Sequence, residues 1–475
     1  MKNFHGYPGC CGITRRGFLL GAGAGLAVGA PLGWLGLKGW QAYHQSPFTG
    51  RTHEVERPEF AMPGPFPGRV VEVHHEGSVD ESNTISRDAV QDMMARGMCG
   101  LTGADHPSEA WRRFFGPDDV VGVKVNPVGR KAMNGEGGRM AGAVGSISSP
   151  EVVLEIVAGL KGAGVKPRNI IIFERYANEF RQAGYDELMR EREMDGIHWY
   201  ASAHAYDEQQ LAIDGQSRSE RDPNVVGYDP DVFVSMGFAS PHHNPRDDRR
   251  FRTHCSTIVT RMVNKFITIP VLKDHRSAGV TLALKNLSHG MNNNVARSHI
   301  GGIYRLGGAT SGPNQCNTFI PTAVAQDPIR QKATLHIMDG LIGVYEGGPG
   351  CWNRSWSTWQ RKSLFFATDP VAMDHVGWDI IDTKRAMEGW QSVAHMGLHE
   401  IVPTESISPR LVSLAMMGRP EAAALAVQQK AKQIRGRPSE AFDRRQPEHV
   451  ILAGLLGLGT FDAHAIEHRY HEVPV

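Results

Sequence analysis

Short apolar runs alternate with stretches of helical periodicity from about residue 120 onward. Residues 120–125 and 169–174 are compact apolar runs, typical of buried strands. Between them, apolar residues recur at helical spacing over 152–160, after Ser149 as N-cap and Pro150 at the first helical position. The order strand, helix, strand predicts a βαβ unit, in which the two strands are parallel.

The same alternation continues toward residue 385. It predicts strands at 231–237, 265–272, 334–339 and 363–368, and helices at 257–264, 277–287 and 369–385, the last capped by Asp369. Two more helices, rich in Ala and Met, are expected within 407–433. The pattern predicts an α/β fold of three layers, a mostly parallel sheet with helices on both faces, followed by a helical C-terminal region.

The N-terminus carries the features of an export signal. Arg15 and Arg16 precede an uncharged apolar run that extends to residue 37, which is typical of the bacterial twin-arginine signal. We therefore expect the twin-arginine export machinery as a partner, and a location in the periplasm or on the outer face of the cytoplasmic membrane. A run of roughly 20 residues also suffices to span a bilayer, so an uncleaved signal would serve as a membrane anchor.

These features divide the chain into four parts. Residues 1–37 form the signal or anchor, and 38–117 a tether and N-terminal extension. Residues 118–400 form the α/β core domain, and 401–475 a helical C-terminal extension. With 475 residues and 41% hydrophobic content, the chain is long and apolar enough to bury a substantial core.

Charge and cysteine content exclude two classes of function. The 51 basic and 50 acidic residues leave a formal net charge of +1, so there is no basic excess with which to bind nucleic acid. The six cysteines form no C-x-x-C motif, so we expect no iron–sulfur cluster.

Charged and polar residues follow nearly every predicted strand. In open parallel sheets, ligands bind beyond the carboxyl ends of the strands, and these ends lie at one edge of the sheet. The charged and polar residues at or just after the carboxyl ends of the predicted strands are Lys124, Asn126, Glu174, Lys273, His275, Asp339 and Glu346. We expect them to converge on one site.

The segment 273–302 is the densest in such residues. Lys285 and His289 are four positions apart, so they share a helix face. Leucines surround Lys285, which therefore either reaches the surface with its amine or is buried with a lowered pKa. A buried amine would serve in proton transfer, in a Schiff base, or in binding an anion, with Asn286 beside it. Alternatively, His289 and His299 bind a divalent metal together with Asp339 and Glu346.

The ordered blocks 121–126, 148–164, 170–174, 267–286, 337–350 and 367–381 resemble the bacterial and archaeal family known as domain of unknown function 362. The resemblance covers roughly residues 118–385. Several relatives append a ferredoxin-like cysteine domain, whose cysteines this chain lacks. Membership would imply the α/β fold, but no established reaction.

A second, more local similarity concerns His275 and Lys285 alone. Their spacing, after a strand and into a glycine-containing helix, is similar to that in the nickel-dependent lactate racemases. There such a His and Lys serve a nickel-pincer nucleotide, to which the Lys is bound covalently. The similarity implies a cofactor at this site, which is consistent with the export of a protein already folded around its cofactor.

Two hypotheses follow from these patterns. The first is an exported enzyme with a cofactor- or metal-assisted site for a small anionic or carbonyl substrate. In it, Lys285 anchors the ligand, His275 is the general acid or base, and Asp339 and Glu346 orient it or bind a cation. The alternative is an exported module that binds a ligand or metal, or an accessory subunit of a membrane redox complex.

Overall fold

The computed structural model of the protein describes residues 58–130, 143–206, 210–216, 221–236, 244, 246–275, 278–299, 316–351, 356–393 and 447–474. The predicted export signal, residues 1–37, and the helices expected within 407–433 lie outside these ranges. None of the helices within the described ranges has the length and apolar character needed to cross a membrane.

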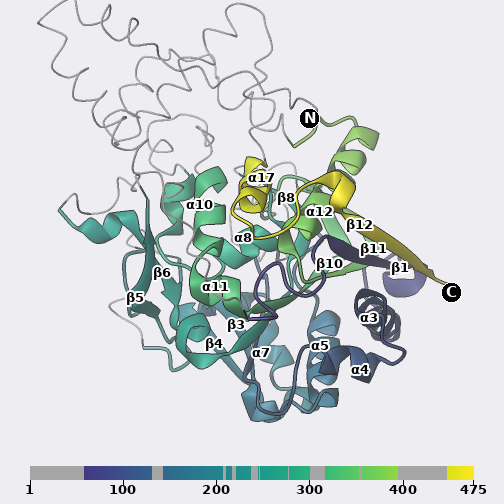
Figure 1. Ribbon diagram of the computed structural model, residues 1–475, viewed down its shortest axis with the longest axis horizontal. Helices are drawn as coiled ribbons and strands as arrows, with labels where there is room; N and C mark the ends of the chain where they lie inside the picture. Colours follow the sequence, from purple (N-terminus) through teal and green to yellow (C-terminus); the bar gives the residue numbers. More distant parts are fainter. Residues whose placement is uncertain are drawn as a thin grey trace, which may run out of the picture.

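A sheet of ten strands runs through the centre of the described chain (Figure 1). Eight of them follow the order β12 (Glu467–Val473), β1 (Arg69–His75), β11 (Ser357–Ala367), β10 (Ala333–Glu346), β7 (Lys265–Thr268), β2 (Val121–Lys124), β3 (Ile170–Tyr176), β4 (His198–Ala203). From β10 to β4 all neighbours are parallel, whereas β11 is antiparallel to both β10 and β1. The strand β8 (Val271–His275) pairs with β10, and β9 (Gly279–Val280) with β8. A separate pair consists of β5 (Tyr228–Ser235) and β6 (Arg252–Ser256).

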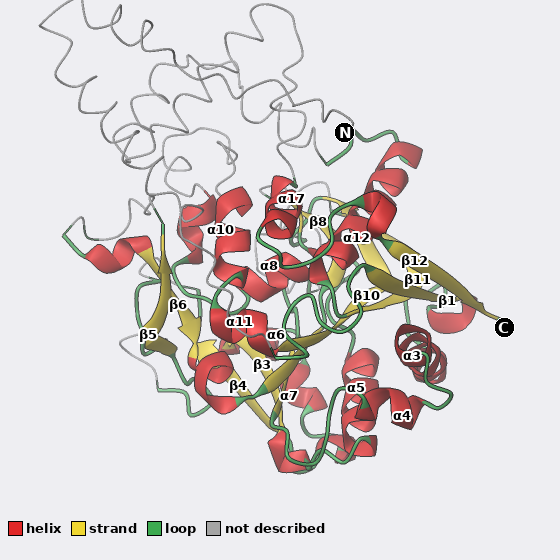
Figure 2. Cartoon of the chain, in the orientation of Figure 1, coloured by secondary structure: helices red, strands yellow, loops and turns green. Residues whose placement is uncertain are grey.

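Helices cover both faces of this sheet, as predicted, so the fold is three-layered α/β (Figure 2). On one face lie α3 (Arg87–Thr102), α4 (Pro107–Arg112), α5 (Pro150–Gly162), α6 (Ala177–Gln182) and α7 (Tyr185–Leu188). On the other lie α8 (Leu282–His289), α10 (Cys316–Val324), α11 (Asp327–Lys332), α12 (Pro370–Met387) and α17 (Glu448–Leu455). Short helical turns complete the chain: η2 (Glu76–Ser78), η3 (Pro167–Asn169), η4 (Arg192–Met194), η5 (Asp248–Phe251), η6 (Ile258–Met262), η7 (Val295–His299) and η8 (Ala463–Ala465).

The sheet has an apolar core on each face, because side chains along its strands point alternately to the two faces. On β3, Ile170 and Ile172 pack into the core beneath α5, whereas Ile171 and Phe173 pack into the core beneath α8. Successive side chains of a strand point to opposite faces, so a strand covered on both faces is apolar throughout. This explains why the central strands are continuous apolar runs in the sequence.

The prediction of a single strand at 265–272 is wrong, because the structure has two strands in this segment. β7 ends at Thr268, and β8 begins at Val271 after Pro270. Proline has no N–H to donate, so it interrupts the ladder. The chain then shifts sideways, and β8 pairs with the distal half of β10 instead of continuing along β2. This step carries Lys273 and His275 to the site described below.

The described parts of both predicted extensions belong to the central sheet. β1 lies within 38–117 and pairs with β11, and β12 lies within 401–475 and pairs with β1. Val70 and Val71 are both fully buried, because helices cover both faces of β1. The described residues before 118 and after 446 therefore form one sheet with the predicted core domain.

Candidate functional site

Six of the polar side chains predicted for the site lie buried where β2, β3 and β8 end and α8 begins. Each is at most 7% exposed to solvent. They are Lys124, Asn126, Glu174, Lys273, Lys285 and Asn286. Burying this many polar groups is unfavourable unless each finds partners, so their contacts indicate their roles.

Lys124 connects three elements of the fold. Its amine pairs with the Glu174 carboxylate on β3 and donates hydrogen bonds to the Val125 carbonyl at 2.6 Å and to Asn286 Oδ1 at 3.2 Å. These contacts use the three donors of the ammonium group. A Cβ on Gly290 would lie 2.9 Å from the Lys124 amine, so glycine leaves the space that this side chain needs. Lys124 thus orients Asn286 and Glu174.

Lys273 lies beside the loop that follows β2. Its amine donates to Asn126 Oδ1 at 3.3 Å and to the Val128 carbonyl at 3.4 Å. Asn126 is held in turn, because its N–H donates to Ser148 Oγ at 2.8 Å. Burial lowers the pKa of Lys273 to about 7, and the positive charge of Lys285 acts in the same direction. The two lysines are therefore near enough to repel each other.

Lys285 lies on α8 among buried leucines. Burial lowers the pKa of its amine to about 8; the nearby Cys316 thiol acts to raise it, and the Arg175 guanidinium to lower it. An amine with this pKa is partly neutral at physiological pH, as a nucleophile or base requires. The sequence left open whether the Lys285 amine reaches the surface or is buried, and in the structure the side chain is buried.

His275 is buried at the end of β8. Side chains alternate along a strand, so His275 is on the same side of β8 as Lys273, and Asp274 is on the opposite side. Asp274 accepts hydrogen bonds from the Gly348 N–H at 2.7 Å and from the Gly347 N–H at 3.1 Å. This alternation favours His275 as a neighbour of the Lys273 amine.

Two predicted site residues have structural partners instead. Asp339 accepts hydrogen bonds from the Ser149 N–H at 2.8 Å and the Leu341 N–H at 3.1 Å, so it ties β10 to the start of α5. Glu346 lies 2.6 Å from the buried Arg385 guanidinium of α12, which also donates to the Tyr345 carbonyl. Both carboxylates therefore fasten elements of the fold.

The metal-binding alternative finds no support in the described chain. Among the described residues, no three His, Cys, Asp or Glu side chains are grouped so that they could hold a metal ion. His289 instead lies between two hydroxyls, 3.0 Å from Ser288 Oγ and 2.8 Å from Ser298 Oγ. The side chain of His299 lies outside the described part of the structure.

Sequence reasoning missed two buried residues near Lys285. Cys316 begins α10 and His449 lies on α17, and α10 packs against both α8 and α17 (Figure 1). Burial lowers the pKa of His449 to about 3, with the charge of Lys285 as a second cause, so the imidazole is neutral. Neither of its ring nitrogens has a hydrogen-bond partner within the described chain, and neither has Asn286 Nδ2. Buried groups in this state are typical of a site that a ligand completes.

The signal for these residues in the sequence was weak. A lone Cys and a lone His, more than 130 positions apart, form no motif, and His449 lies within the stretch 401–475 that we read as an extension. Arg175 was missed as well, although it follows Glu174 directly at the end of β3. Strand-end position predicted Glu174, and the same rule extended by one residue would have included Arg175.

Asp374 of α12 holds the start of α8 in place. Helix α8 begins at Leu282, five residues later than predicted, and Thr281 provides no side-chain cap. The fully buried Asp374 carboxylate instead accepts hydrogen bonds from the Ala283 N–H at 2.7 Å and the Leu284 N–H at 2.9 Å. A carboxylate at a helix N-terminus is stabilising, so a residue distant in sequence performs the capping.

We expect Asp374→Ala to lower the free energy of unfolding by about 3 kcal/mol, because it leaves two buried N–H groups without acceptors. Urea denaturation measures this loss. Asp379→Ala is the matched control, since Asp379 lies on the same helix with a largely exposed side chain. Equal losses in the two variants would contradict the capping role.

Comparison with known proteins identifies one part of the chain. Residues 246–379 match the family model of the domain of unknown function DUF362. No curated protein and no solved structure matched the chain. The matched segment contains Lys273, His275, Lys285 and Asn286, whereas Lys124, Glu174 and His449 are contributed from outside it.

Proposed function

We propose that this chain, whose residues 246–379 form a DUF362 domain, is an enzyme that acts on a small anionic or carbonyl-containing substrate at the buried Lys273–Lys285 site. The observation that carries the proposal is the pair of buried amines, whose pKa values burial lowers to about 7 and about 8. Burial destabilises the charged forms of both lysines, and groups with such shifted pKa values are concentrated at functional sites.

The charge of the surrounding cluster favours an anion. Beside Lys273 and Lys285, the cluster holds the Arg175 guanidinium, which acts on the pKa of Lys285, and the Lys124 amine, which Glu174 neutralises. Glu179 is also near, and burial raises the pKa of its carboxyl. The net charge of these groups is positive, and a substrate carboxylate or phosphate would balance it.

The lowered pKa also allows covalent chemistry at Lys285. A neutral amine attacks a carbonyl carbon, forms a C=N bond, and releases the carbonyl oxygen as water with the two protons of the amine nitrogen. His275, predicted as a general acid or base, would assist these proton transfers from the same side of β8 as Lys273. The neutral His449 imidazole has an N–H to donate to a substrate oxygen.

Reductive trapping tests this proposal. We expect incubation with glyoxylate and cyanoborohydride at pH 7.5 to alkylate Lys285 ahead of the surface lysines, since roughly two hundred times more of its amine is neutral than of an ordinary lysine. Peptide mass mapping identifies the modified residue, and Lys166, exposed on the surface, is the internal control. Acetaldehyde, a carbonyl without the carboxylate, should react more slowly at Lys285. Modification spread evenly over surface lysines would overturn the proposal.

We also propose that the protein is exported. The proposal rests on the sequence alone, on Arg15 and Arg16 and the apolar run that follows them. Replacing both arginines by lysine should retain the protein inside cells of a bacterial host. Unchanged export of that variant would contradict a twin-arginine route.

A further inference from the structure

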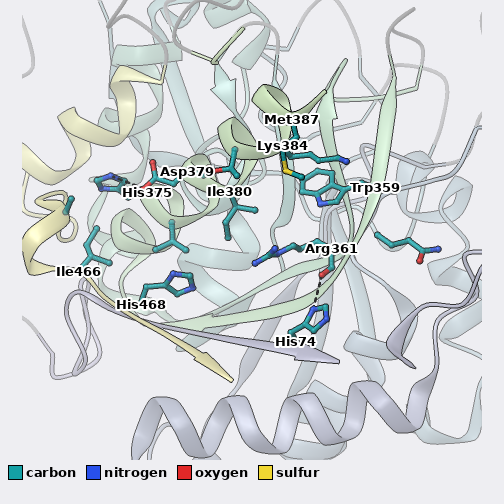
Figure 3. Close-up of a pocket in the computed structure, with 14 residues that line it drawn as sticks. His74, Trp359, Arg361, His375, Asp379, Ile380, Lys384, Met387, Ile466 and His468 are labelled. Atoms are coloured by element: carbon teal, nitrogen blue, oxygen red, sulfur yellow. Dashed lines mark hydrogen bonds and ion pairs between the residues drawn. The ribbon is translucent and has the colours of Figure 1, made fainter. Parts of the chain in front are cut away.

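A cavity lies at the end of the sheet opposite to the strands that carry the Lys285 site. It has a volume of about 560 Å³ and is lined by α12 and by the strands β11, β1 and β12 at that end of the sheet (Figure 3). In the sheet order, β10 and β7 separate these strands from β2 and β3, which carry Lys124 and Glu174. A cavity of this size is typical of sites for small organic ligands.

Nitrogen-bearing side chains dominate the polar part of its lining. They come from all four elements and are His74, Arg361, His375, Lys384 and His468. The lining contains one carboxylate, Asp379, whose side chain is 71% exposed. The guanidinium of Arg361 and the ammonium group of Lys384 are the cationic groups among the nitrogen-bearing side chains, and such groups suit a ligand with anionic oxygens.

A buried carboxylate beneath the cavity fixes two of these donors. Glu72 on β1 is fully buried, and its Oε1 accepts bonds from Arg361 Nε at 3.0 Å and Nη2 at 2.7 Å. Its Oε2 lies 3.0 Å from His468 Nε2. Burial acts to raise the pKa of Glu72, but the bonds from His468 and Arg361 outweigh it and hold the pKa below its usual value.

The arrangement of Glu72 leaves part of Arg361 for a ligand. Arg361 donates to Glu72 through Nε and Nη2, so Nη1 is the guanidinium nitrogen that these two bonds do not use. A buried ion pair contributes little to stability by itself, whereas a charged group held in one orientation is what ligand recognition requires. Lys384, on α12, adds a second ammonium group to the lining; its amine pairs with Glu388, which is 40% exposed, so a ligand in the cavity would share this amine with that carboxylate.

The remaining lining is apolar and includes a flat aromatic surface. Val376 and Ile380 project from α12, Ile466 precedes β12, and Trp359 lies on β11. The Trp359 ring packs on Gly343, where a Cβ would lie 2.5 Å from it, so the backbone of β10 supports the indole. A supported indole beside aliphatic side chains is suited to stacking with a planar ring.

We propose that this cavity binds a small organic anion with a flat apolar body, its charged group toward Arg361 and Lys384 and its ring beside Trp359. Anilinonaphthalene sulfonate has both features, and phenyl-naphthylamine is the same molecule without the sulfonate. We expect the full-length protein to bind the sulfonate at one site about tenfold more tightly than the neutral compound, measured by fluorescence titration.

Three variants locate the binding. Ile380→Trp fills the cavity and should abolish binding of both compounds, whereas Lys384→Gln should weaken the sulfonate about tenfold and leave the neutral compound unchanged. Arg361→Gln should have the same effect on binding. If Arg361→Gln unfolds because Glu72 loses its partner, Lys384→Gln alone still tests the proposal. Lys285→Met should bind both compounds normally, because it lies in the other site. Equal affinity for the two compounds, or unchanged binding in Ile380→Trp, would overturn the proposal.

Discussion

Replacing Lys285 by Met is expected to raise the free energy of unfolding at pH 7 by about 3 kcal/mol while abolishing reductive trapping of glyoxylate. The gain arises because burial lowers the pKa of Lys285 from 10.5 to about 8, which means that folding destabilises its charged form. An apolar side chain of similar length removes that cost. A residue that reduces stability and yet occupies a buried polar cluster is typical of a functional site.

The pH dependence of stability provides an independent measurement. Between pH 8 and 10.5 the unfolded chain holds a proton on Lys285 that the folded protein has released. The free energy of unfolding of the wild type should therefore rise with pH across this window, and below pH 8 the full cost is present. In Lys285→Met this rise should become smaller, and the part that remains is the contribution of Lys273, whose pKa is also lowered.

Urea denaturation at pH 7 and pH 10 measures both effects. Lys166→Met, on the exposed surface, serves as the control and should change stability by less than 0.5 kcal/mol, on the order of ordinary surface substitutions. A Lys285→Met variant that loses stability would show that the amine supports the fold, and the proposed function would fail.

Replacing Lys124 by Met should have the opposite effect, a loss of about 3–5 kcal/mol. Lys124 and Glu174 are 1% and 3% exposed, so the variant leaves the Glu174 carboxylate buried without its cation. Asn286 also loses the donor that orients it. We expect reductive trapping at Lys285 to fall as well, because Asn286 and Lys285 are adjacent on α8.

Two further variants separate the ion pair from packing. The double variant Lys124→Met with Glu174→Leu should recover most of the lost stability, because neither charge of the pair is then left buried without the other. Lys265→Met breaks a partly exposed pair with Asp119 at 3.0 Å, and its cost should stay near 1 kcal/mol. If Lys124→Met cost no more than Lys265→Met, Lys124 would not be the organising residue of the site.

Local chemistry made several elements predictable. The cap at Asp369 is confirmed, since its carboxylate accepts from the Val371 and Ala372 N–H groups, with Pro370 at the first helical position. Apolar runs predicted β2 and β3 closely, but only the second half of β11, which begins at Ser357 and not at residue 363. By contrast, the cap of α8 is Asp374, some 90 residues away, and no local pattern reveals such a partner.

The sequence predicted which polar residues stand at the ends of strands, but it did not predict the role of each residue. Lys273 and Glu346 both follow apolar strand residues, and the sequence treats them alike. In the fold, the Glu346 carboxylate meets the Arg385 guanidinium from α12, whereas Lys273 meets the charge of Lys285. A salt-bridge partner and a repelling neighbour are consequences of packing, so only three-dimensional contact distinguishes structural from functional groups.

The sequence by itself determined the layered α/β class, the sheet-edge position of the polar residues, and the DUF362 resemblance, because these depend on periodicity and on short motifs. The tertiary structure decided that β1 and β12, from far-separated segments, complete the sheet, and that Lys285 is buried beside Cys316 and His449. It also decided where the cavity beside α12 lies. Strand partners and the pKa of a buried amine depend on what surrounds a residue in space, and the order of residues along the chain does not contain that information locally.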